Sequence, residues 1–92
     1  MERYYVNGVC LDVDHSTLIY DFYKDIFLEN ETHDCVYRTN SGCFFRVISG
    51  NAISKDVKIL SGSDEAKKII NEHPAYICVD SYDSVFGRPP EA

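Results

Sequence analysis

The chain has 92 residues, 15 of them acidic and 9 basic, which gives a formal net charge of -6. This length predicts one domain over residues 1–92, with one core. The acidic balance opposes contact with a phosphate backbone and so excludes direct nucleic-acid binding. No apolar run approaches the roughly 18 residues that a membrane span needs.

The cysteines at positions 10, 35, 43 and 78 form neither a C-x-x-C motif nor a metal-like spacing. No secretory signal pattern opens the sequence. We therefore expect reduced thiols in a cytoplasmic protein.

The N-terminal stretch predicts a hairpin and then a short helix. Asn7-Gly8 is the preferred dipeptide of a type I′ turn, and pairing Val6 with Val9 places Tyr4 and Leu11 on one face. A helix is expected near residues 17–24, capped by Asp14 or Ser16. Its core-facing residues would recur at three- and four-residue spacing: Leu18, Ile19, Phe22, Tyr23 and Ile26.

The segment from His33 to Ser49 predicts a central hairpin closed by a three-residue loop, Asn40 to Gly42. In this register one face is apolar and the other is mixed. The apolar face carries Cys35, Tyr37, Phe45 and Val47. The mixed face carries Asp34, Val36, Arg38, Phe44, Arg46 and Ile48. Three interpretations of the mixed face stay open: a solvated sheet, a helix packed over the arginine stems, or cross-strand pairing with Asp34.

The C-terminal part predicts another strand over 57–60 and the main helix over 64–73, which ends before Pro74 and packs on the apolar face. Residues 75–79 read as a last strand or an extended arm along the sheet. A further turn over 82–86 closes at Gly87, and 88–92 form an exposed tail. The fold class is α+β: an antiparallel sheet of four to six strands built from hairpins, with the main helix on one face.

Several motifs together resemble a known family. They are Tyr-Tyr-x-Asn-Gly near the start, Val-Tyr-Arg-Thr-x-x-Gly-x-Phe-Phe in the central hairpin, Asp-Glu-Ala-Lys-Lys in the main helix and Val-Phe-Gly near the end. The chain thus resembles a family of small, largely uncharacterised proteins encoded by bacteria, phages and mobile elements. The likeness spans roughly Tyr4 to Gly87. The chain departs from the family by having Gly50-Asn51 where a Gly-Gly often stands, and by lacking a Trp in the helix.

Reactive side chains are few. His33 and Cys35 share a strand face, whereas Asp34 points the other way, so no carboxylate is predicted beside them. The histidines, including His15 and His73, are therefore expected to be surface or hydrogen-bonded residues. We predict no metal site, no cofactor and no catalytic residue. The rival prediction is a small thiol-dependent or nuclease-like enzyme that uses Cys35 with His33 or His73.

Aromatic content points to binding, because seven Tyr and five Phe exceed what one small core requires. The predicted function is that of a non-enzymatic module that binds a protein with a basic surface. The family resemblance implies its specific form: a phage or mobile-element inhibitor of a bacterial defence protein, anti-CRISPR-like, acting by steric occlusion. A homodimer joined through a strand edge is a further alternative. The predicted partner-binding residues are Tyr5, Glu29, Glu31, Asp34, Arg38, Phe44 and Arg46.

Overall fold

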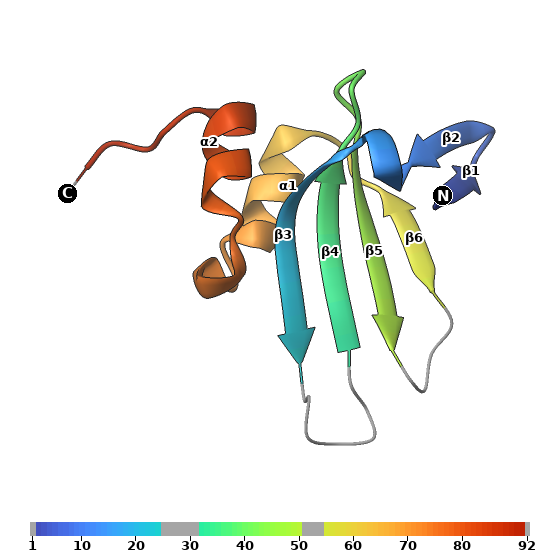
Figure 1. The fold of residues 1–92 in the computed structure, drawn as a ribbon, viewed down its shortest axis with the longest axis horizontal. Coiled ribbons are helices and arrows are strands. Elements are labelled where there is room, and N and C mark those ends of the chain that lie inside the picture. The colour runs from blue at the N-terminus through green and yellow to red at the C-terminus, as the bar shows by residue number, and fades with distance from the viewer. Residues whose placement is uncertain (1, 25–31, 51–54, 92) are drawn as a thin grey trace.

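The computed structural model describes residues 2–24, 32–50 and 55–91 and shows the predicted α+β architecture (Figure 1). Among these residues, a four-stranded antiparallel sheet has the order β3-β4-β5-β6, and β1 and β2 form a separate two-stranded sheet. The elements are β1 (Arg3–Val6), β2 (Val9–Asp12), the 3-10 turn η1 (Val13–His15), β3 (Thr17–Lys24), β4 (Thr32–Arg38), β5 (Phe44–Gly50), β6 (Asp56–Ile59), α1 (Ser63–Ile70), the 3-10 turn η2 (Pro74–Tyr76) and α2 (Val79–Phe86).

Both predicted hairpins are confirmed, including their registers. Val6 pairs with Val9, and the turn residues Asn7 and Gly8 both have positive φ, at 51° and 76°, as a type I′ turn requires. In the central hairpin Cys35 pairs with Val47. Its loop closes where the Thr39 N–H donates to the Cys43 carbonyl oxygen at 2.8 Å.

The helix predicted near residues 17–24 is wrong, because these residues form strand β3. The segment is rich in β-branched and aromatic residues, which lose side-chain freedom in a helix and pack well on a pleated surface. The pairing of this strand with β4 shifts at a bulge between Leu18 and Tyr20, so burial along β3 departs from simple alternation. The bulge lets the consecutive residues Ile19 and Tyr20 both be buried.

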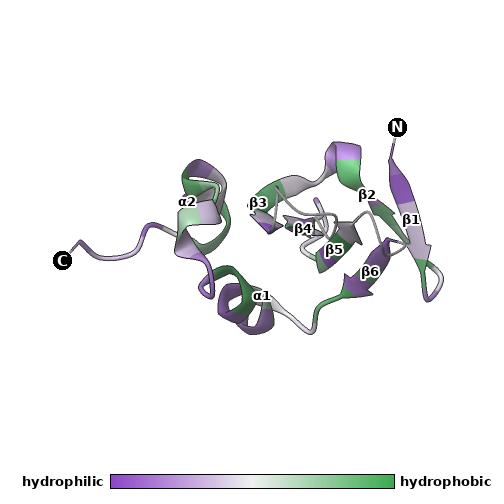
Figure 2. Ribbon diagram, turned by 90° about the horizontal axis from the view of Figure 1, so that it is seen from below, coloured by the Kyte–Doolittle hydropathy of each residue, from purple (hydrophilic) through white to green (hydrophobic). Residues whose placement is uncertain are grey.

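The two faces of the four-stranded sheet are covered by different elements (Figure 2). Helix α1 buries Ala66 and Ile70 against Val36 and Phe44, which belong to the mixed face. The prediction that the main helix packs on the apolar face is therefore wrong. Of the two arginines on the mixed face, Arg46 forms a two-pronged ion pair with Asp34, so its charge is compensated on the side of the sheet that the helices cover.

The apolar face is covered instead by the β1–β2 hairpin. Leu11 packs there with Phe45 and Val47 in a second core cluster, and Tyr4 and Val6 border it. This hairpin could cover the sheet because its own apolar side needed a partner, and β1 lies beside β6.

The C-terminal part agrees with the sequence only in places. Helix α1 ends at Ile70, before the predicted His73, and α2 is longer than the predicted turn but does close at Gly87, which has a φ of 86°. The predicted strand at 75–79 is reduced to one bridge, between Tyr20 and Ile77. Residues 88–91 are exposed, as predicted. Within the described part of the chain, both helices are too short to cross a bilayer.

Candidate metal centre

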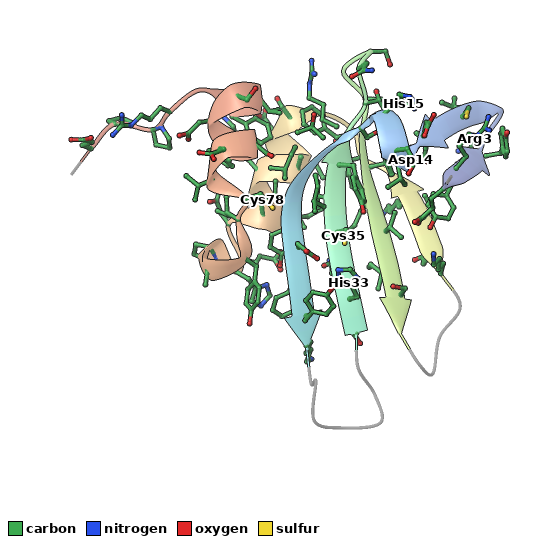
Figure 3. All side chains as sticks on the ribbon, in the orientation of Figure 1. Arg3, Asp14, His15, His33, Cys35 and Cys78 are labelled. Atoms are coloured by element: carbon green, nitrogen blue, oxygen red, sulfur yellow. The ribbon has the colours of Figure 1, made fainter. Side chains whose placement is uncertain are left out.

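A cluster of three potential metal ligands lies on the face of the sheet that carries the β1–β2 hairpin, but outside the hydrophobic cluster under that hairpin. Asp21 comes from β3, and His33 and Cys35 come from β4. Strand pairing explains the meeting: Asp21 stands directly opposite Cys35, and His33 is two residues from Cys35 on the same face. In Figure 3, His33 and Cys35 lie one after the other along β4.

The ligand atoms converge on one point. Nε2 of His33 lies 3.0 Å from Sγ of Cys35 and forms a short contact with Oδ1 of Asp21. The Cys35 sulfur is 3.6 Å from the same Asp21 oxygen. All three atoms lie within 4.8 Å of one another.

Neighbouring aromatic side chains hold these ligands in place. The ring of Tyr23 stacks on the His33 ring, with centroids 4.0 Å apart and planes 7° from parallel. Tyr37 follows on the same face of β4, two residues after Cys35. Such surrounding contacts fix the orientation of ligand side chains and so reduce the free-energy cost of binding an ion.

Burial raises the pKa of the Cys35 thiol to about 12, and the negative charge of Asp21 adds to this rise. The side chain is only 5% exposed. At neutral pH Cys35 is therefore a protonated, shielded thiol. A bound cation would favour the thiolate, because it would compensate the negative charge.

The arrangement differs from a Cys-His-Asp nucleophile system. In such a system one ring nitrogen receives the thiol proton and the other is held by the carboxylate. Here Nε2 of His33 faces both Cys35 and Asp21. One ring nitrogen therefore contacts both the sulfur and the carboxylate oxygen, and the three potential ligand atoms are grouped around one point.

The sequence predicted part of this cluster. His33 and Cys35 do share a face, and Asp34 does point away from them, toward Arg46. Asp21 was missed, because a helix at 17–24 would have placed it away from the β4 partner. The usable signal was the Thr, Ile, Tyr and Phe content of that segment, which favours a strand.

The other histidines have separate partners. His15 Nδ1 lies 2.8 Å from a carboxylate oxygen of Asp12, and its hydrogen bond holds the pKa of Asp12 below the usual value. His73 Nδ1 lies 2.9 Å from the Tyr20 hydroxyl and its ring stacks on Phe22. Both match the prediction of surface or hydrogen-bonded histidines.

The five predicted partner-binding residues that the structure describes lie in different environments. Asp34 and Phe44 are buried, and Arg46 is held by Asp34. Tyr5 is 75% exposed, on the hairpin at the other side of the sheet. Arg38 is half-buried, and Glu29 and Glu31 lie outside the described residues. Among the described members of the predicted patch, Tyr5 is thus the fully exposed one.

Comparison of the chain with known protein families, with curated proteins and with solved structures finds no match.

Proposed function

We propose that the protein binds one transition-metal ion of the Zn²⁺ class through Asp21, His33 and Cys35. The convergence of one carboxylate oxygen, one imidazole nitrogen and one sulfur on a single point carries the proposal. Cysteine sulfur and imidazole favour Zn²⁺ and similar ions, whereas Mg²⁺ and Ca²⁺ prefer a shell of oxygens.

The distances fit this ion class after a small adjustment. Zn–S, Zn–N and Zn–O bonds of about 2.0–2.3 Å place tetrahedral ligand atoms roughly 3.3–3.6 Å apart. The Cys35–Asp21 separation of 3.6 Å already matches. The two contacts of His33 Nε2 are closer, at 3.0 Å to sulfur and shorter to Asp21, so they would widen as the ion enters.

The test is a titration of the reduced, metal-free protein with Co²⁺. We expect one equivalent to produce a thiolate-to-cobalt charge-transfer band, and Zn²⁺ to abolish it by displacement. Loss of a contact that merely supports a ligand costs 10–100-fold in affinity, so Cys35→Ser or His33→Ala should cost more than about a hundredfold. Metal at about 100 times its Kd should also raise the free energy of unfolding by about 2.7 kcal/mol.

Cys10→Ser is the matched control, because Cys10, Asp12 and His15 line a separate surface pocket with the same kinds of donor atoms. This variant should bind cobalt as the wild type does. A band that disappears in Cys10→Ser and survives in Cys35→Ser would contradict the proposed site, and so would a wild-type protein without any such band.

A second function, binding of a protein with a basic surface, is proposed on different grounds. Its support is the net charge of -6 together with the large exposed fraction of Tyr5. Inhibition of a bacterial defence protein is the specific form that we infer from the sequence resemblance.

A further inference from the structure

We propose that the metal centre keeps a fourth coordination position that is open to solvent and takes a neutral donor, namely water that an imidazole nitrogen can replace. This inference rests on the proposed function, since it describes what the bound ion does with its remaining position. A metal centre with such an open position can exchange its fourth ligand, whereas a structural metal centre has all its positions filled by the protein.

The first support is the way in which the ligands are placed. All three project from the same face of two neighbouring strands, so an ion bound to them lies above that face, with the sheet on one side of it. In the described part of the chain, no fourth carboxylate, histidine or cysteine joins the group. A tetrahedral ion held in this way has one direction that points away from the sheet.

Solvent access is the second support. The His33 and Asp21 side chains are 32% and 35% exposed, whereas Cys35 is buried. The cluster therefore has a closed side, at the sulfur, and an open side, at the imidazole and the carboxylate. Water reaches the ion from the open side and occupies the fourth position when no other ligand is present.

Charge decides which donors can replace that water. One thiolate and one carboxylate supply two negative charges, and these neutralise a divalent cation. An incoming anion would thus meet a neutral centre on a protein whose net charge is -6, and it gains little electrostatic attraction. A neutral nitrogen donor does not depend on electrostatic attraction to the centre, and imidazole is a preferred ligand of Zn²⁺ and Co²⁺.

The experiment uses the full-length protein loaded with one equivalent of Co²⁺, titrated separately with imidazole and with azide. We expect imidazole to shift the cobalt d–d bands in a saturable way with the thiolate-to-cobalt band retained, because Cys35 stays bound. Azide should shift the same bands only at higher concentration than imidazole does. Cys10→Ser should respond as the wild type does.

The outcomes separate this inference from the proposed function. If cobalt binds and imidazole leaves the d–d bands unchanged, the site is closed: the inference is wrong, and metal binding stands. Loss of the thiolate band on adding imidazole, or azide binding as tightly as imidazole, also overturns it. If the wild type binds no cobalt, the proposed function fails first.

An imidazole nitrogen can come from a free small molecule or from a histidine of another polypeptide. Light scattering of the zinc-loaded protein at two concentrations, without imidazole, distinguishes a second copy as the source. A zinc-dependent dimer that His15→Ala abolishes would assign the donor to the exposed His15 of a second copy. If the protein is a monomer at both concentrations, no second copy supplies the fourth ligand, and water or a donor from another molecule occupies that position.

Discussion

At the scale of single residues, Asp34 and Cys35 show how one peptide bond separates two environments. Cys35 faces Asp21 and His33 on one side of the sheet, and Asp34 faces Arg46 beneath the helices on the other. Successive strand residues point to opposite faces, so the sequence was sufficient to separate these two. The partner of Asp34 lies on β5, and the carboxylate beside Cys35 lies on β3, which had been predicted as a helix.

The ion pair of Asp34 and Arg46 yields a stability prediction. The Arg46 Nε and Nη2 atoms donate to the two carboxylate oxygens at 2.9 and 2.6 Å, and the side chains are 9% exposed for Asp34 and 28% for Arg46. Arg46→Met should lower the free energy of unfolding by about 3 kcal/mol, because it leaves a buried carboxylate unpaired. Asp34→Asn should cost less, about 1–2 kcal/mol, because the half-buried guanidinium can still reach water.

The double variant Asp34→Leu/Arg46→Met is the informative control. It removes both charges, so its stability should return to within about 1 kcal/mol of the wild type. Urea unfolding with matched m-values measures all three variants. If the double variant loses as much free energy of unfolding as the two single variants together, packing and not charge pairing dominates at this position.

At the scale of elements, the turns were the most predictable features and β3 the least. Asn7-Gly8 and the loop before Cys43 carry local conformational preferences that do not depend on the rest of the chain. Strand β3 depends on a distant partner, because its hydrogen bonds are made with β4, a segment that follows it in the sequence. A local pattern therefore decided the turns, whereas pairing decided the strand.

Gly42 provides the test of the central turn. Its φ is 94°, a conformation that L side chains rarely adopt, although a Cβ there would meet Arg38 Nη2 at an ordinary 3.6 Å. Gly42→Ala should therefore lower the free energy of unfolding by about 1 kcal/mol or more through backbone strain alone. Thermal or urea unfolding measures the difference.

Gly62→Ala is the matched control, because Gly62 has extended φ and a Cβ there meets nothing within 4 Å. Its effect should stay within about 0.5 kcal/mol of zero. Equal losses in the two variants would mean that the positive φ at Gly42 is not the cause.

At the scale of the whole molecule, the protein is a sheet with helices on one face and a hairpin on the other (Figure 1). Most of the aromatic side chains that were predicted to be free for binding are packed between the sheet and the elements that cover it. Phe44 stacks on Phe86 with ring centroids 5.5 Å apart, and Phe22 stacks on both Tyr20 and His73. The predicted surplus of aromatic residues is thus largely used by two packed layers, and the exposed tyrosines lie at separate places on the surface.

Binding of a basic partner is tested on the intact protein. We expect affinity capture from a bacterial lysate to retain a partner at low salt and to weaken as salt is raised, because the attraction between exposed charges is screened. Tyr5→Ala should reduce the affinity about tenfold or more, as an exposed aromatic anchor would. Tyr76→Ala is the control, because Tyr76 is also exposed but lies in η2, where its ring contacts Phe22. Capture that does not depend on salt or on Tyr5 would contradict this surface.

The sequence by itself determined the α+β class, both hairpins with their registers, the main helix and the shared face of His33 and Cys35. These features rest on periodicity and on turn preferences, which act over a few neighbouring residues. Only the tertiary structure decided which layer covers which face, that residues 17–24 pair as a strand, and that Asp21 meets the β4 ligands. Those outcomes depend on contacts between segments far apart in the chain, where an ion pair such as that of Arg46 can make a mixed face suitable for burial.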